Sequence, residues 1–536
     1  MSGIVVCVDQ RAADQGAGVL AAGGNAFDVA VATAFVQMVV MPFSCGVGGM
    51  ASAHLWKSDS AQRVVIDGLL RAGSRATPGM WATDYKGEAE FSGSSLFEDY
   101  RSTMGYTSIC TPGTVASLAE VHRLFGSLLW KDLLRPAIEI ARGGFQFEPV
   151  TTAALTEDSG IYQPDQITRL KATRECARLY YREPATEAFG PREFRNADYA
   201  DTLARLADGG ARDFYEGELG NVIARDLKRN GSFVTADDLR SYAPKTYLPM
   251  VVSYRGYDVW SNVSPGGGPL LLEALNVIDG MDMAGLRHSS AEHLARLAAT
   301  LQLVSLERRD LLGDPDHVGY RVHQTFVSKE RAARLRDRVL SGEIGAEPPP
   351  VDEPDTTHLT VVDADGNVAA ITHSNGQHSG VVTPGLGFVY NNGMNRFDPR
   401  PGHPSSLAPG KARLHLMMPS IAFKDERPAI VLGAPGGNAI LSALVQTLSN
   451  AVDFGMDPAD AVSATRIHAE GSTVWCESRL PGETVDGLAE RGFTVVQHSG
   501  PLAPRMAWAQ LVVIGRDGTL TGASDPRGSA GVAHVG

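Results

Sequence analysis

A β-hairpin that starts just after a pair of threonines is the strongest structural signal in this sequence. Two runs rich in β-branched residues, 360–362 and 368–372, flank the polar turn 363–367, which contains Asp365-Gly366. An Asp-Gly pair between two such runs is typical of a tight hairpin turn. The hairpin therefore predicts that Thr356 lies at the start of a strand, directly after the Gly-, Pro- and Glu-rich linker 341–355.

The pairing of the two strands decides what faces Thr356. If Val362 pairs with Val368, Thr356 lies opposite Ser374, whereas a turn of only two residues places it opposite Asn375. An internal threonine in either register is an ordinary β-branched strand residue. At a chain terminus it would carry an α-amine that titrates near about 7.7–8.0 and could take the proton of its own hydroxyl.

Composition excludes several classes of function. The net charge of −13, with no basic block to offset it, argues against nucleic acid as a partner. Five scattered cysteines indicate reduced thiols rather than a disulfide framework. The first residues lack the pattern of a signal peptide, so we expect a cytoplasmic protein.

The longest apolar run, 29–43, contains Gln37 and is too short to cross a membrane, so it predicts a buried helix. Residues 46–51 match the pattern GxGxxA, but a helix precedes them and a strand follows, which is the wrong context for a dinucleotide site. His373 and His378 do not form a convincing metal site, and the sequence implies no cofactor.

Alternating helix and strand patterns predict a layered α and β protein. We expect helices at 11–23 and 26–40, the second capped by Asn25, and strands at 247–261 and 388–390. A strand at 429–432 leads through glycines into a helix at 439–454, for which Asn438 is the expected cap.

Several motifs in order along the chain resemble the γ-glutamyltranspeptidase family. The stretch TTHLTVVDADGN from Thr356 is similar to the start of that family's small subunit. The other motifs are GVLAAGGNAFD (18–28), PGTV (112–115), FYEG (214–217), YRGY (254–257), NN (391–392), APGG (434–437) and GASDPR (522–527). The resemblance implies the α+β, four-layer αββα sandwich of N-terminal nucleophile hydrolases.

The resemblance also implies self-cleavage before Thr356. The hydroxyl would attack the carbonyl of Asp355, and water would hydrolyse the resulting ester. The products would be a large subunit, 1–355, and a small catalytic subunit, 356–536, which remain one intertwined domain. The new N-terminal threonine would then cleave a small-molecule amide through an acyl-enzyme.

Three further residues match catalytic positions of the family. Ser374 corresponds to a second hydroxyl beside the nucleophile, in agreement with the first hairpin register. Gly436 and Gly437 correspond to an oxyanion hole, because two backbone N–H groups at a helix start can stabilise negative charge. Without the resemblance, they would be a strand-end serine and a strand-to-helix turn.

The substrate-binding positions depart from the family. Relatives bind the α-carboxylate of a γ-glutamyl group with an arginine and a Ser-Ser pair, where this chain has Leu69 and His415-Leu416. They bind its ammonium with an aspartate, where this chain has Arg396, which would repel an ammonium and attract a carboxylate.

The sequence leaves the substrate-binding role of two other positions undecided. Arg71 could have moved into the pocket in place of the missing arginine. A substrate-binding asparagine of the family aligns with either Asn375 or Gly376.

The sequence therefore favours an amidohydrolase or acylase whose acyl group carries a carboxylate but no glutamyl amine. A true γ-glutamyl hydrolase or transpeptidase is the alternative, and an inactive, uncut binding protein is a second one. A serine hydrolase is disfavoured because the chain contains no GxSxG motif. Expected partners are the small-molecule substrate and the two subunits of one precursor, without nucleic acid or membrane. A higher oligomer is left open.

Overall fold

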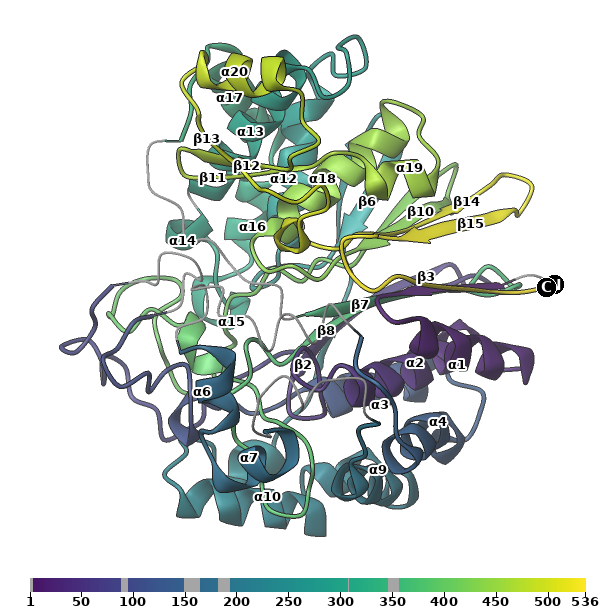
Figure 1. The fold of residues 1–536 in the computed structure, drawn as a ribbon, viewed down its shortest axis with the longest axis vertical. Coiled ribbons are helices and arrows are strands. Elements are labelled where there is room, and N and C mark those ends of the chain that lie inside the picture. Colours follow the sequence, from purple (N-terminus) through teal and green to yellow (C-terminus); the bar gives the residue numbers. More distant parts are fainter. Residues whose placement is uncertain (1–2, 88–94, 149–163, 182–192, 307, 346–355) are drawn as a thin grey trace.

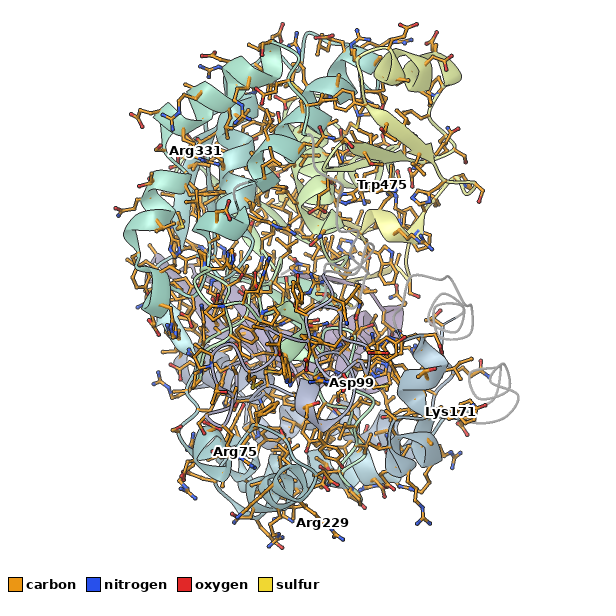
Figure 2. The ribbon with its side chains drawn as sticks, turned by 90° about the vertical axis from the view of Figure 1, so that its left-hand side faces the viewer. Arg75, Asp99, Lys171, Arg229, Arg331 and Trp475 are labelled. Atoms are coloured by element: carbon orange, nitrogen blue, oxygen red, sulfur yellow. The ribbon has the colours of Figure 1, made fainter. Side chains whose placement is uncertain are left out.

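Two β-sheets face each other and are covered by helices on their outer sides (Figure 1). The computed structural model describes residues 3–87, 95–148, 164–181, 193–306, 308–345 and 356–536. Asp355 and most of the predicted linker lie outside these residues. Figure 2 shows the molecule turned by 90°, with the exposed Arg229 at its lower end and the exposed Lys171 at the right-hand edge of its lower half.

Within the described residues, the first sheet has seven strands. In spatial order they are β16 (Gly531–Val535), β1 (Gly3–Cys7), β7 (Thr357–Val362), β8 (Val368–Ser374), β2 (Met50–Lys57), β3 (Gln62–Gly68) and β4 (Lys245–Tyr247). Strands from before and after the predicted cleavage point are therefore intermixed in one sheet.

The second sheet has six strands in the same part of the chain. They are β15 (Leu520–Ser524), β14 (Gln510–Ile514), β10 (Arg427–Gly433), β9 (Ser420–Lys424), β6 (Tyr257–Ser261) and β5 (Met250–Tyr254). A small third sheet contains β11 (Ile467–Glu470), β12 (Thr473–Cys476) and β13 (Thr494–Gln497).

The helices divide along the chain into two groups. The earlier group is α1 (Gln10–Ala21), α2 (Ala26–Val40), α3 (Thr114–Phe125), α4 (Trp130–Gly143), α6 (Gln166–Leu170), α7 (Arg174–Tyr180), α9 (Ala197–Gly209), α10 (Glu218–Arg229) and α11 (Ala236–Arg240). The later group is α12 (Gly268–Asp279), α13 (Ala291–Leu306), α14 (Arg308–Leu311), α15 (Pro315–Val318), α16 (Arg321–Phe326), α17 (Lys329–Leu340), α18 (Ala439–Val452), α19 (Pro458–Ser463) and α20 (Gly482–Ala489). Short 3-10 turns are η1 (Tyr106–Ser108), η2 (Ala211–Phe214), η3 (Gly393–Arg396) and η4 (Pro504–Met506).

Three apolar cores hold the layers together. One lies between the first sheet and helices such as α1, α2 and α4, and another joins the second sheet to α12, α13 and α18. Between the sheets, Val362 and Val368 pack with Phe423 and Val431. Strands β7 and β8 are buried on both faces, so their apolar residues do not alternate with exposed polar ones. The predicted four-layer αββα sandwich is confirmed.

Helix α2 confirms the prediction of a buried helix. Its side chains are all buried, and it begins at a capping box in which Asn25 and Asp28 satisfy each other's backbone N–H groups. Gln37 is buried in the same helix. No helix in the described ranges combines the length and apolarity that a membrane span requires.

Two strand predictions are wrong. Residues 247–261 are not one strand, because Arg255 and Gly256 both have positive φ and turn the chain back into the hairpin β5–β6. Residues 388–390 are not a strand, although Tyr390 exchanges backbone hydrogen bonds with Ser379 and Val381. Their apolar character reflects complete burial in an irregular segment rather than membership of a sheet.

Candidate active site

The hairpin register places Thr356 opposite Ser374. Strand β7 pairs with β8 so that Val362 faces Val368 and Thr357 faces His373, as the first of the two predicted registers requires. The Thr356 hydroxyl donates a hydrogen bond to Ser374 Oγ at 3.3 Å, and Thr356 is 8% exposed. Gly376 N–H also donates to Ser374 Oγ, at 2.9 Å. Ser374 therefore fixes the threonine hydroxyl at the start of the strand.

Gln37 anchors the strand that follows Thr356. Its Nε2 donates to the Thr357 hydroxyl at 2.9 Å and to the His358 carbonyl at 3.2 Å. His373 Nε2 donates to its Oε1 at 2.9 Å. Gln37, a polar residue in an otherwise apolar helix, is thus hydrogen-bonded to both strands of the hairpin next to Thr356.

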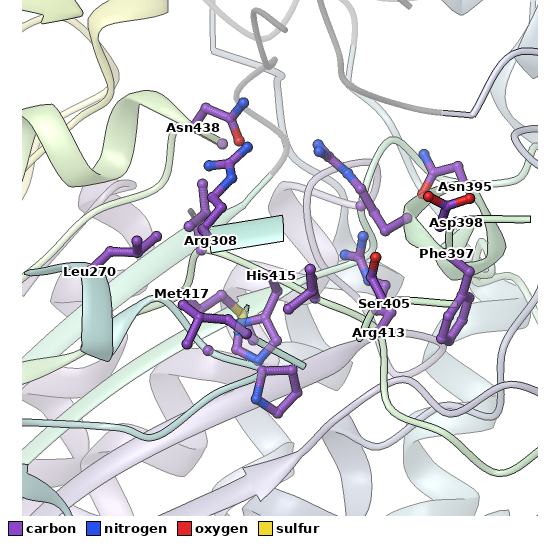
Figure 3. A pocket seen from close by; sticks show the side chains of 18 of the residues that line it. Leu270, Arg308, Asn395, Phe397, Asp398, Ser405, Arg413, His415, Met417 and Asn438 are labelled. Carbon is purple, nitrogen blue, oxygen red and sulfur yellow. The ribbon is translucent and has the colours of Figure 1, made fainter. Parts of the chain in front are cut away.

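A cavity of about 320 Å³ opens in front of Thr356 and Ser374. In Figure 3, Asn438 and Arg308 lie on one side of it, and Asn395, Phe397 and Asp398 lie on the other. Its polar and charged walls include Arg308, Gln377, Asn395, Arg396, Asp398, Arg400, His403, Arg413, His415 and Asn438. Four arginines among these residues outnumber two carboxylates, Asp310 and Asp398, and Asp398 pairs with Arg400.

The glycine turn between β10 and α18 reaches the same cavity. Gly437 lines it, and both Gly436 and Gly437 have positive φ, at 140° and 56°. A Cβ on Gly436 would lie 2.2 Å from Ala507 Cβ, so this turn requires glycine. The start of α18 thus lines the same cavity as Thr356.

Asn438 does not cap α18 as predicted. It stands at the N-cap position, but its side chain accepts no hydrogen bond from the helix. Its amide instead donates to Glu470 at 3.1 Å, and Glu470 also pairs with Arg308 at 3.2 Å. This cluster fixes the end of the glycine turn from outside the helix.

The structure brings some of the predicted substrate-binding residues together and separates others. Arg396 and His415 both line the cavity. Arg71 is not among the residues that line it, and its guanidinium donates to the Gly410 carbonyl at 3.3 Å instead. Asn375 is fully buried and donates to the Pro42 carbonyl, whereas Gly376 lies on the cavity wall.

Sequence reasoning missed three arginines of the cavity, Arg308, Arg400 and Arg413. Arg413 is 5% exposed, and its Nη2 lies 3.7 Å from the thioether of Met50. Its position two residues before His415, in a segment already suspected of binding substrate, is the signal that could have found it. Arg308 carries no comparable signal, because it lies far from every motif in the sequence.

Comparison with known proteins identifies the family. The sequence model described as Gamma-glutamyltranspeptidase matches residues 12–535. The chain belongs to the γ-glutamyltranspeptidase family. Like other enzymes of this family, it acts on amides as a hydrolase or acyltransferase.

Relatives within the γ-glutamyltranspeptidase family carry two kinds of name. The Acylase ACY 1 proenzyme of Pseudomonas sp. (strain V22) is 31% identical over 533 residues, which cover 97% of this chain and 91% of that protein. The Glutathione hydrolase proenzyme of Escherichia coli (strain K12) is 29% identical over 547 residues, which cover 98% and 90%.

A solved structure within the family confirms the fold. The crystal structure of cephalosporin acylase from Bacillus halodurans matches with a TM-score of 0.86 at 28% identity, covering 99% of this chain and 95% of that one. The agreement over nearly the whole of both chains assigns the αββα sandwich of N-terminal nucleophile hydrolases to this γ-glutamyltranspeptidase family member.

Proposed function

We propose that this chain is an acylase that cleaves itself before Thr356 and then hydrolyses amides whose acyl group ends in a carboxylate. One observation carries the proposal. Thr356 directly precedes β7, with its hydroxyl 3.3 Å from Ser374 Oγ, on the wall of a cavity that Gly437 and several arginines also line. A hydroxyl, a helix start and cationic walls are the parts that acyl transfer from an anionic amide requires.

The position of the Thr356 hydroxyl, at the end of the linker, supports self-cleavage. Thr356 Oγ1 attacks the carbonyl carbon of Asp355, the peptide C–N bond breaks, and the nitrogen takes a proton to become a free amine. Water then hydrolyses the ester, releasing the Asp355 carboxylate and restoring the hydroxyl. The chain becomes the subunits 1–355 and 356–536.

Amide hydrolysis repeats the same chemistry on a substrate. The α-amine of Thr356 takes the hydroxyl proton as Oγ1 attacks the substrate carbonyl. The N–H groups at Gly436 and Gly437 stabilise the oxyanion, and the leaving amine takes the proton. Water then hydrolyses the acyl-enzyme to release the acid.

Arg396 supports the choice of acyl group. It lines the cavity at the position where relatives that bind γ-glutamyl compounds place an aspartate, and its charge opposes an ammonium. A γ-glutamyl group carries an α-ammonium, whereas a glutaryl group of the same length does not. Discrimination against the ammonium thus follows from the sign of the charge at one residue.

The test compares γ-glutamyl-p-nitroanilide with glutaryl-p-nitroanilide on protein shown by gel electrophoresis to be cleaved. We expect the glutaryl compound to have the higher kcat/KM, and Thr356→Ala to remain a single uncut chain without activity. A wild-type chain that stays uncut, or a preference for the γ-glutamyl compound, would refute the proposal.

A further inference from the structure

Arg413 and His415 form a polar pair on the wall of the cavity. They lie in the segment that follows the loop at 397–411, and a backbone hydrogen bond holds each of them in place. Arg413 N–H donates to the Leu70 carbonyl at 3.2 Å, and His415 N–H donates to the Pro265 carbonyl at 2.9 Å. Both residues line the cavity with Thr356 (Figure 3).

Arg413 lies close to the nucleophile's hydrogen-bond partner. Its Nη2 is 3.6 Å from the place that a Cβ on Gly376 would occupy, and Gly376 is the residue whose N–H donates to Ser374 Oγ. The contacts around the guanidinium include the thioether of Met50, and burial keeps the neighbouring Cys110 as a neutral thiol by raising its pKa to about 12. A cation is therefore held in a buried part of the cavity wall, beside a thioether and a neutral thiol.

His415 is a buried ring without a partner. It is 7% exposed, and neither ring nitrogen has a hydrogen-bond partner among the residues that the structure describes. Burial and the adjacent Arg413 lower the pKa of His415 to about 3, so the ring is neutral and offers one donor and one acceptor. Because buried polar groups are normally hydrogen-bonded, an unpartnered ring on a cavity wall points to a ligand.

We propose that Arg413 and His415 together bind the free carboxylate of the acyl group and select ω-carboxyacyl amides over neutral ones. The inference rests on the proposed function and names the residues that determine its specificity. The planar guanidinium suits two-point contact with a carboxylate, and the neutral imidazole adds one N–H donor. Arg396, which is only half-buried, has the weaker role of excluding an ammonium.

The experiment uses matched pairs of p-nitroanilides that differ only in the terminal carboxylate: succinyl with butanoyl, glutaryl with pentanoyl, and adipyl with hexanoyl. On cleaved wild-type protein, at least one carboxylate compound should exceed its neutral partner in kcat/KM by about tenfold or more. Arg413→Met should lower kcat/KM for that compound by about 10- to 100-fold, which is the usual effect of losing a charge-assisted contact, and should change the neutral partner by less than about threefold.

Matched variants separate this site from a general effect of charge. The informative quantity is the ratio of kcat/KM for the carboxylate compound to kcat/KM for its neutral partner. His415→Phe should lower this ratio by about three- to tenfold. Arg287→Met, which removes an exposed arginine paired with Glu483, should leave the ratio unchanged. If Arg413→Met does not fold or cleave, Arg413→Ala is assayed with added guanidinium ion, which should restore hydrolysis of the carboxylate compound selectively.

Two results would overturn the inference. One is a cleaved, active wild type whose preference for the carboxylate survives both Arg413 substitutions, which leaves the proposed function intact. The other is a cleaved wild type that prefers no carboxylate compound or is inactive on all six. An uncut wild type, or activity that survives Thr356→Ala, would instead refute the proposed function itself.

Discussion

At the scale of single residues, Gln37 shows how a buried polar group serves the site without touching substrate. Helix α2 is otherwise almost wholly apolar, and the amide would be costly to bury without partners. Its hydrogen bonds to Thr357, His358 and His373 satisfy the amide and fix the two residues that follow Thr356. The sequence revealed the glutamine as an interruption but gave no indication of its partners.

Replacing Gln37 with leucine should destabilise the protein and slow self-cleavage. The change leaves the Thr357 hydroxyl and the His373 ring buried with a lost partner each, so we expect a loss of about 2–4 kcal/mol in the free energy of unfolding. Urea unfolding measures the stability, and a gel time course of the freshly made chain measures cleavage.

Thr33→Val is the matched control in the same helix. Thr33 is fully buried, and its hydroxyl has no hydrogen-bond partner among the described residues, so the substitution should be neutral or slightly stabilising. Equal behaviour of the Gln37 and Thr33 variants would contradict the assigned role of Gln37.

At the scale of elements, the turn from β10 to α18 is shaped by backbone conformation rather than by a side-chain cap. The strand, glycines and helix could be predicted from the sequence, because the apolar run and the Gly-Gly pair are local signals. The cap by Asn438 could not, because its true partner, Glu470, lies 32 residues away in sequence and meets it only in the folded protein.

Gly436→Ala should damage this turn. At φ 140° an alanine is strained, and its Cβ would lie 2.2 Å from Ala507 Cβ, so we expect a loss of about 2–4 kcal/mol in the free energy of unfolding and a lower kcat. Gly18→Ala, in the middle of α1 with nothing within 4 Å of the new Cβ, should stabilise by about 0.5–1 kcal/mol. A Gly436→Ala protein with wild-type stability and kcat would contradict the requirement for glycine.

The hairpin was predictable and its register was narrowed to two alternatives, whereas the strand at 388–390 was predicted wrongly. The turn at 363–367 contains its own signal, and the β-branched runs on both sides agree with it. Phe388 and Tyr390 are apolar because they are buried, and burial alone does not distinguish a strand from an irregular segment. Arg413 was missed for a similar reason, since only the folded chain places it beside Gly376.

At the scale of the whole molecule, layered packing buries imidazoles far from water. Burial lowers the pKa to about 3 in each member of a group of histidines: His54, His358, His373, His415 and His468. In the unfolded chain the same rings titrate near about 6.5. Their contribution to stability is fully present above pH 6.5 and is lost as the pH falls toward 3, because only the unfolded chain takes up the protons.

The protein should therefore lose stability in mild acid, and His54→Gln should lose less. At pH 5, a ring with these two pKa values costs about 2 kcal/mol, because each unit of pKa difference corresponds to about 1.4 kcal/mol. Urea unfolding at pH 7 and pH 5 should show a drop that is smaller by about this amount in the variant. An identical drop in both proteins would show that His54 does not contribute.

The alternation of strands in the first sheet has a consequence for the mature enzyme. Strand β1 lies between β16 and β7, and β8 pairs with β2, so the proposed subunits share backbone hydrogen bonds along several seams. The proposed cleavage before Thr356 would therefore release neither subunit from the folded protein, but it would change the molecularity of folding. The precursor folds as one molecule, whereas two separated pieces must find each other again, so dilution opposes recovery after heat. The proposed cut would thus generate the active enzyme and, by the same step, make its unfolding harder to reverse.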